Sequence, residues 1–319
     1  MKELRIIFMG TPEFAVQGLK NLIEAGENVI GVITAPDRPA GRGRKINESA
    51  VKIYAKKQDL KILQPTNLKS EEFLEELKSL NANLQVVVAF RMLPKAVWQL
   101  PEYGTFNLHA SLLPNYRGAA PINWAIINGE YKTGVTTFFI DEKIDTGAVI
   151  LQQETKISKD ENAGDLHDKL MCLGGKLILD TVKLIKKGNV QPQPQTLTTA
   201  LHPAPKLNRD NTKINWEKPA EEIINKIRGL SPYPVAWTLF ENNRQQRQMK
   251  IYAAHLIQED EEIPKNPENK SLTAAGGRLF IKCKDEFIVL DEVQLPGKRK
   301  MKVKDLLNGF NLERDAKVL

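Results

Sequence analysis

Nearly continuous apolar runs alternate with helical patterns over about the first ninety residues of the chain. The apolar runs, which are typical of strands buried on both faces, cover 4–9, 29–34 and 84–89. The helical patterns between them cover 14–26, 49–57 and 70–80. Short apolar strands that alternate with helices predict βαβ units in a doubly wound parallel α/β sheet. Such a sheet carries its site beyond the carboxyl ends of its strands.

The pattern changes after an amphipathic stretch at 163–187, which we expect to form a long helix that ends before Gly188. Proline then recurs with polar spacers, which indicates an extended linker. Beyond it the sequence predicts a helix at 220–230, then short alternating runs at 235–240, 249–256, 278–282, 287–290 and 292–295. These runs predict a small β-barrel or sandwich. We therefore expect a first domain over 1–189, a linker over 190–208 and a smaller second domain over 209–319.

The composition of the 319 residues, 41% hydrophobic and 27% charged, is that of a globular protein with a sizeable core. No apolar stretch approaches the roughly 20 residues of a membrane span. The amino-terminal apolar run is too short for a signal peptide. We therefore expect a cytoplasmic protein without a membrane partner. No apolar seam indicates an obligate protein partner, so we also expect a monomer.

Several kinds of cofactor chemistry are disfavoured by spacing. Cys172 and Cys283 are too far apart for a zinc or disulfide framework, and no other metal-ligand cluster occurs, so we expect no metal. The turn at 10–15 lacks the G-x-G-x-x-G spacing of a dinucleotide site, and no Walker sequence is present. Nicotinamide, flavin and P-loop chemistry are therefore disfavoured.

The net charge of +7 contains two local basic clusters. The first cluster is Arg38, Arg42, Arg44 and Lys45, and the second is Lys298, Arg299, Lys300, Lys302 and Lys304. Either cluster alone is also explained by a solvated surface. Two such clusters on one chain make a polyanionic partner a hypothesis to test.

Polar residues with catalytic chemistry occur in the apolar stretch 104–114. Alternation through this stretch predicts a strand, which places Asn107 and His109 on the same face. One interpretation is a pair of hydrogen-bonded core residues. The other is a site, because an amide can donate to a developing oxyanion and an imidazole moves protons near neutral pH.

The imidazole needs an orienting partner, and Asp145 in the loop 141–147 is a candidate. Because Asp145 precedes Thr-Gly, it could equally be a turn residue that caps its own backbone. If Asp145 meets His109, the site holds an amide, an imidazole and a carboxylate without a serine or cysteine nucleophile. That set suits transfer of a carbonyl group to an incoming amine.

The motifs at this point resemble those of the methionyl-tRNA formyltransferase family. They are FMGTPEFA at 8–15, PDRPAGRG at 36–43, NLHASLLP at 107–114, YRGAAPI at 116–122, GVT at 134–136 and DEKIDTG at 141–147. Their order and spacing follow the family over essentially the whole chain. The Asn-x-His-x-Ser-Leu-Leu-Pro and Asp-Thr-Gly elements mark the wider formyl-folate transferase superfamily.

The resemblance implies a Rossmann-like domain followed by an OB-like β-barrel domain that binds tRNA. It implies 10-formyltetrahydrofolate as donor and the α-amino group of methionyl initiator tRNA as acceptor. It also assigns catalysis to Asn107, His109 and Asp145, with Asp145 holding the useful tautomer of His109 and favouring its charged form. The residues implied for folate binding are Ser111, Leu112, Leu113, Pro114, Phe90, Arg91 and Met92. The residues implied for tRNA binding are Arg38, Arg42, Arg44 and Lys45.

The stretch 89–94 departs from the family pattern, because it is one residue shorter than usual and contains Arg91. It resembles the purine-pathway relatives, in which this segment lines the folate pocket. Arg91 could equally be a surface charge at the start of a loop.

Two alternative functions remain open at this stage. One is a formyl-folate transferase or hydrolase that acts on a small amine, such as a glycinamide ribonucleotide or an amino-sugar nucleotide. The other is a non-catalytic tRNA-binding protein built on a decayed transferase domain.

Overall fold

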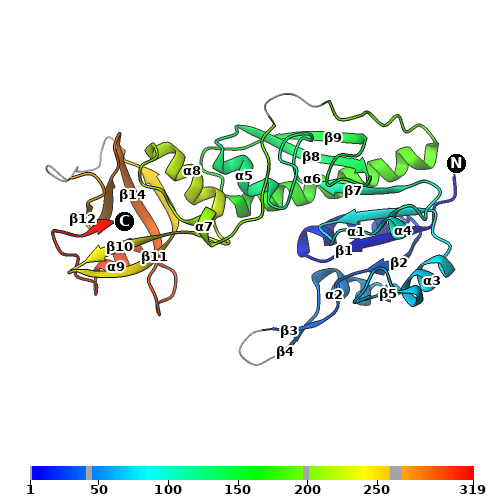
Figure 1. The fold of residues 1–319 in the computed structure, drawn as a ribbon, viewed down its shortest axis with the longest axis horizontal. Coiled ribbons are helices and arrows are strands. Elements are labelled where there is room, and N and C mark those ends of the chain that lie inside the picture. The colour runs from blue at the N-terminus through cyan, green and yellow to red at the C-terminus, as the bar shows by residue number, and fades with distance from the viewer. Residues whose placement is uncertain (1, 41–44, 197–200, 259–267) are drawn as a thin grey trace. The chain divides into compact units, whose positions relative to one another are not determined.

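The computed structural model describes residues 2–40, 45–196, 201–258 and 268–319 (Figure 1). The chain packs as two compact units, and neither unit is one continuous stretch of sequence. Unit 1 consists of Met1–Gly118, Lys132–Lys156 and His167–Pro203, and unit 2 consists of Ala119–Tyr131, Ile157–Leu166 and Ala204–Leu319. The division expected from the sequence, with domains over 1–189 and 209–319 and a linker over 190–208, stays a prediction.

Unit 1 is built on a seven-stranded sheet of order β5-β2-β1-β6-β7-β8-β9. Its strands are β1 Ile6–Gly10, β2 Val29–Ile33, β5 Ile62–Leu63, β6 Leu84–Val88, β7 Thr105–His109, β8 Lys132–Phe139 and β9 Val149–Lys156. Its helices are α1 Glu13–Glu24, α2 Ala50–Lys57, α3 Glu71–Ser79, α4 Lys95–Trp98 and, shared at its start with unit 2, α6 Ala163–Lys187. A small hairpin of β3 Arg38–Ala40 and β4 Lys45–Asn47 lies between β2 and α2.

The topology of this sheet places a site where the sequence predicts one. The strands from β5 to β7 are parallel, whereas β8 and β9 pair antiparallel. The chain runs outward from β1 to β5 and then crosses to β6 on the other side of β1, so the strand order reverses there. The α/β fold is confirmed. The strands β8 and β9, which follow the stretch from which the parallel sheet was predicted, extend the sheet by antiparallel pairing.

Helices cover both faces of the sheet. On one face, Ile7 and Met9 of β1 belong to a buried cluster with Phe73 of α3 and Val97 of α4. On the other face, α6 lies so close to β7 that a methyl group at Gly174 would come within 2.6 Å of Leu108. Since neighbouring residues of a strand point to opposite faces, Asn107 and His109 point away from α6.

Unit 2 is an antiparallel β-barrel with helices packed against it. Its strands run in the order β12-β13-β14-β11-β10-β16, with β15 paired to β14. They are β10 Ala236–Asn242, β11 Gln245–Leu256, β12 Leu272–Ala275, β13 Arg278–Lys282, β14 Phe287–Gln294, β15 Met301–Lys302 and β16 Lys317–Val318. The helices are α5 Pro121–Ile127, α7 Arg209–Thr212, α8 Ala220–Leu230 and α9 Val303–Leu307.

The barrel nearly closes because its first and last strands meet. The Leu272 amide donates to the Ala316 carbonyl at 2.8 Å, and the Val318 amide donates to the Lys270 carbonyl at 2.9 Å. The predicted small β-barrel is therefore confirmed. In the described part of the chain, no helix is both long enough and apolar enough to cross a bilayer.

Candidate active site

The carboxyl end of β7 carries Asn107 and His109 on one face of the sheet. Central strands flank this position, with Asn107 opposite Val87 of β6 and His109 opposite Thr136 of β8. His109 is only 6% exposed, whereas Asn107 is half-buried. Within the described ranges, the Asn107 amide has no hydrogen-bond partner in the protein. Its two N–H donors are therefore available to a ligand at the strand end.

The His109 ring is held from both of its nitrogens. Nε2 lies 2.8 Å from the Tyr116 carbonyl oxygen, and Nδ1 lies 3.8 Å from Asp145 Oδ2. Because a carbonyl oxygen can only accept, Nε2 carries the proton. The sequence-based expectation that Asp145 sets the tautomer is corrected, since the Tyr116 carbonyl does so. At 3.8 Å, Asp145 acts on the ring through its charge.

The Asp145 carboxylate is fixed by the backbone of another segment. Its Oδ2 accepts a hydrogen bond from the Gly118 amide at 2.9 Å. Its residue has a φ of +55°, in the left-handed region. Two residues later, a Cβ on Gly147 would lie 1.7 Å from the Phe139 carbonyl oxygen, so only glycine fits. The loop after β8 thus passes tightly over the end of its own strand and reaches His109.

Gln195, from the segment predicted as a linker, holds the same loop. Its side-chain amide donates to the carbonyl oxygens of Asp145 at 3.0 Å and Gly147 at 2.8 Å. Its own oxygen accepts from the Arg117 guanidinium at 2.6 Å. The sequence around Gln195 gives no sign of this role, since its proline pattern indicates only an extended chain.

The loop 111–114, which the sequence predicted to bind folate, is held by hydrogen bonds from side chains of β8 and β9. The Thr136 hydroxyl donates to the Ser111 carbonyl at 2.6 Å, and the Gln152 amide donates to the Leu113 carbonyl at 2.8 Å. The Ser111 hydroxyl is itself used, because it donates to the Asn115 carbonyl at 2.6 Å. Ser111 and Leu113 are buried, while Leu112 and Pro114 are half-buried. The first two shape the loop, and the last two present surface.

The segment 90–92 follows directly after β6, at the same sheet edge. The Arg91 guanidinium donates to the Thr66 carbonyl at 3.0 Å and also to the Pro65 carbonyl. Burial, and then the nearby charge of Arg38, lower the pKa of Arg91 below its ordinary value. Phe90 is half-buried, whereas Met92 is 73% exposed. Arg91 is therefore tied to the neighbouring loop, and Met92 is the freest side chain of the three.

The first basic cluster belongs to the β3–β4 hairpin. Arg38 is exposed at the start of β3, and Lys45 begins β4. Arg42 and Arg44 lie outside the described residues. The hairpin projects from the body of unit 1 (Figure 1).

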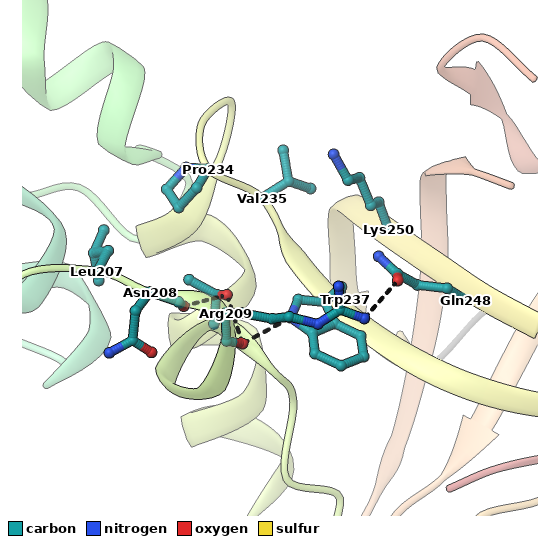
Figure 2. A pocket seen from close by; sticks show the side chains of 9 residues that line it. Leu207, Asn208, Arg209, Pro234, Val235, Trp237, Gln248 and Lys250 are labelled. Atoms are coloured by element: carbon teal, nitrogen blue, oxygen red, sulfur yellow. Dashed lines mark hydrogen bonds between the residues drawn. The ribbon is translucent and has the colours of Figure 1, made fainter. Parts of the chain in front are cut away.

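Unit 2 contains a basic pocket beside an aromatic ring, drawn in Figure 2. The pocket has a volume of about 270 Å³ and is lined by Leu207, Asn208, Arg209, Thr212, Pro234, Val235, Trp237, Gln248 and Lys250. The Arg209 guanidinium lies 4.9 Å from the Trp237 ring centre, and Trp237 Nε1 donates to the Arg209 carbonyl at 3.0 Å. None of the lining residues is acidic. The pocket therefore suits an anion with an aromatic part.

The second basic cluster is also on unit 2. Lys298, Arg299, Lys300, Lys302 and Lys304 are all exposed. In this cluster Lys300 forms an ion pair with Glu292, with its Nζ 2.5 Å from Glu292 Oε2. No three His, Cys, Asp or Glu side chains in the described ranges gather as a metal site would require. The expectation that the protein needs no metal stays a prediction.

Comparisons with known proteins cover both parts of the chain. A family model described as formyl transferase matches residues 4–182, and one described as formyl transferase, C-terminal domain, matches 206–311. The chain is 58% identical over 318 residues to methionyl-tRNA formyltransferase of Flavobacterium johnsoniae, covering 100% of both chains. It is 48% identical over 323 residues to the protein of that name from Bacteroides thetaiotaomicron, covering 99% of each.

Two solved structures share the fold at lower identity. A sugar 3N-formyl transferase, WlaRD, solved with dTDP and 5-N-formyl-THF, has a TM-score of 0.65 at 22% identity and covers 94% of this chain and 100% of its own. HypX from Aquifex aeolicus, in complex with tetrahydrofolic acid, has a TM-score of 0.63 at 16% identity and covers 96% of this chain and 47% of its own. At this identity the likeness supports the fold alone.

Proposed function

The chain belongs to the methionyl-tRNA formyltransferase family, and on that premise we propose that it formylates the α-amino group of methionyl initiator tRNA. The observation that carries the proposal is the approach of Asp145 to within 3.8 Å of His109, beside the free amide of Asn107. The donor is a formyl-folate, which we take to be 10-formyltetrahydrofolate.

The reaction moves one carbonyl group between two nitrogens. The free amine of methionine attacks the formyl carbon, so a C–N bond forms and negative charge gathers on the formyl oxygen. The bond from that carbon to the folate nitrogen then breaks. The proton lost by the amine ends on the folate nitrogen, so atoms and charge balance. Catalysis requires a donor for the oxyanion and a group that moves the proton.

Asn107 supplies the oxyanion donor. Its amide has free N–H groups within the described structure, at the end of a rigid central strand, so it needs little rearrangement during the reaction. Truncating such a donor typically lowers the rate by about 10²–10³.

His109 moves the proton, and Asp145 supports it. Nε2 is occupied by the Tyr116 carbonyl, so Nδ1 is the nitrogen that exchanges a proton, directly or through a bound water. The carboxylate 3.8 Å away stabilises the positive charge that the ring gains when it accepts the proton. The Gly118 amide keeps that carboxylate in place.

The folate lies against the loop 111–114 and the segment 90–92 in this proposal. Both begin at carboxyl ends of neighbouring strands, where a doubly wound sheet binds its ligands. Leu112, Pro114, Phe90 and Met92 offer apolar surface to the pterin, since each keeps some exposure. The buried Ser111 and Leu113 hold the shape of the loop.

The tRNA is held by cations on both units. Arg38 and Lys45 belong to the hairpin of unit 1, and we propose that Arg42 and Arg44, which lie outside the described residues, also bind tRNA. In unit 2, the Trp237 pocket and the cluster 298–304 offer positive charge and one aromatic face, which suits phosphates and an unstacked base. On this ground we assign tRNA binding to the second domain, 209–319.

The test is direct formylation. Purified protein is incubated with 10-formyltetrahydrofolate and with charged or uncharged initiator tRNA, and N-formylmethionyl ester is measured after hydrolysis. We expect product with charged initiator tRNA and none with uncharged tRNA. Formylation of an amino-sugar nucleotide or a glycinamide ribonucleotide instead would indicate the small-amine alternative. Binding of tRNA without product would indicate a non-catalytic protein.

The remaining assignments concern the state of the protein. We propose a monomer that acts in the cytoplasm without a bound metal, with catalysis in residues 1–189 and a linker at 190–208. Gel filtration of the free protein tests the monomer, and formylation measured after treatment with a chelator tests the absence of a required metal.

A further inference from the structure

The two ends of the β3–β4 hairpin meet at one lysine. Arg38 of β3 pairs with Asn47 of β4, at the end of the hairpin away from its turn. Asp37 and Glu48 are therefore the next residues of the two arms toward the base of the hairpin. Lys52 Nζ lies 2.5 Å from Asp37 Oδ2 and 3.1 Å from Glu48 Oε1. A single ammonium group therefore joins both arms at the base of the hairpin.

Lys52 is itself firmly placed in the fold. It lies in the first turn of α2, where its amide donates to the Ser49 hydroxyl at 3.0 Å. Ser49 in turn bonds the Thr34 hydroxyl at 2.6 Å, directly after β2. The side chain of Lys52 is only 11% exposed, although lysine is seldom buried without a partner. The ion-pair clamp formed by Lys52, Asp37 and Glu48 is thus anchored to the central sheet.

Further contacts support each carboxylate. The Gln64 amide donates to Asp37 Oδ1 at 2.8 Å, and Lys56 pairs with Glu48. Hydrogen bonds from Lys52 and then Gln64 lower the pKa of Asp37. Bonds from Lys56 and then Lys52 lower the pKa of Glu48. Both acids therefore stay charged around neutral pH, as an ion-pair clamp requires.

Nothing else in the described hairpin fixes its direction. Arg38, Pro39, Ile46 and Asn47, whose side chains the structure describes, are all exposed, and Ile46 is 72% exposed. A hairpin of two three-residue strands has little stability of its own. Its direction must therefore come from its base.

We propose that Lys52 is a positioning residue that holds both arms of the hairpin and thereby directs Arg38 toward the tRNA. This inference rests on the proposed function, since it assumes that the hairpin binds tRNA. Lys52 does not touch substrate in this account. It acts through Asp37 and Glu48.

The test compares Lys52→Met with Lys52→Arg and with a control, Lys57→Met. Lys57 lies on the same helix, is exposed and has no ion-pair partner among the described residues, so its loss changes net charge equally. Formylation is measured while tRNA and formyl-folate are varied separately. Circular dichroism and the melting temperature verify that each variant is folded.

A KM effect confined to tRNA is expected. If the hairpin of Lys52→Met points productively about one tenth of the time, KM for tRNA rises about tenfold. The kcat at saturating tRNA and the KM for formyl-folate stay within about twofold of wild type. Lys52→Arg keeps the charge, so most of the rise in KM for tRNA is absent in this variant. In an Arg38→Ala background, the effect of Lys52→Met is smaller, because part of the directed surface is already gone.

Three results would overturn the inference. They are a KM for tRNA equal to that of Lys57→Met, a fall in kcat with KM unchanged, and an equal change in both KM values. If Lys52→Met does not fold, Glu48→Gln cuts one arm only and must shift KM for tRNA in the same direction. A wild-type protein that forms no N-formylmethionyl ester contradicts the proposed function instead, which is a separate outcome.

Discussion

The amide of Asn107 offers the sharpest test of the proposed chemistry. In Asn107→Ala both N–H donors are lost, while the backbone pairing of β7 with β6 and β8 remains. Because the amide has no partner in the described protein, truncation leaves no buried group unsatisfied. Stability should therefore change by no more than about 1 kcal/mol. The transition state, by contrast, loses about 2.7–4 kcal/mol, which lowers kcat by about 10²–10³.

The assay is formylation of methionyl initiator tRNA at saturating concentrations of both substrates. Asn189→Ala is the matched control, since it removes an exposed amide that has no side-chain partner in the described chain. The KM for formyl-folate should stay within about threefold, because the donor acts mainly on the oxyanion. A kcat close to wild type would remove Asn107 from the mechanism. A large loss of melting temperature would show a structural role instead.

Three further outcomes follow from other groups. Asp145→Asn keeps an acceptor for the Gly118 amide but loses a charge 3.8 Å from His109, so kcat should fall about 10²-fold, as for impaired proton transfer; an unchanged kcat contradicts this role. Burial raises the pKa of Cys283 to about 12, so at about pH 8 a thiol reagent should label only the exposed Cys172 until the protein is denatured, and native labelling of both would refute this. Hydrogen bonds from Lys270 and Lys284 lower the pKa of Glu217 from 4.5 to about 2. The charged Glu217 therefore stabilises the fold above about pH 4.5, and this contribution is lost as the pH falls toward 2. The melting temperatures of wild type and Glu217→Gln should converge over that range, and a constant difference counts against this account.

Much of the fold could be predicted because its elements follow strong local patterns. The helices α6 and α8 begin and end where the apolar spacing predicts, at 163–187 and 220–230. The helical pattern at 70–80 forms α3, but Ser70, at its start, donates its hydroxyl to the Asn67 carbonyl at 3.1 Å and does not cap the helix. The period of apolar residues thus located the elements better than it identified their end contacts.

Other strands were missed for physical reasons. The runs 287–290 and 292–295 are one strand, β14, and the interruption at Asp291 reflects irregular pairing with β11. The strand β9 was not predicted, since it lies at the sheet edge and its residues 152–154 are exposed and polar. Local alternation does not separate such strands from loops.

The site residues also fall into those that the sequence pattern located and those that it did not. Asn107 and His109 could be placed on one face from a period of two, whereas the approach of Asp145 depends on a loop that crosses a strand end. Gln195, Thr136 and the Tyr116 carbonyl were not assigned roles, because they act through contacts between distant segments. Chemistry carried by a motif is visible in the sequence, while the scaffold behind it depends on tertiary contacts.

The interleaving of the two units has a consequence for synthesis of the chain. Helix α5 packs on α8 within unit 2, where a methyl group at Gly229 would come within 2.7 Å of Ile127. The ribosome finishes α5 roughly ninety residues before it begins α8, an interval of roughly 5–20 s at bacterial elongation rates. For that time the nascent polypeptide carries an uncovered apolar helix next to strands that are already able to pair. Unit 2 therefore cannot be completed until α8 has been made, whereas every segment of unit 1 has been made before α8 begins.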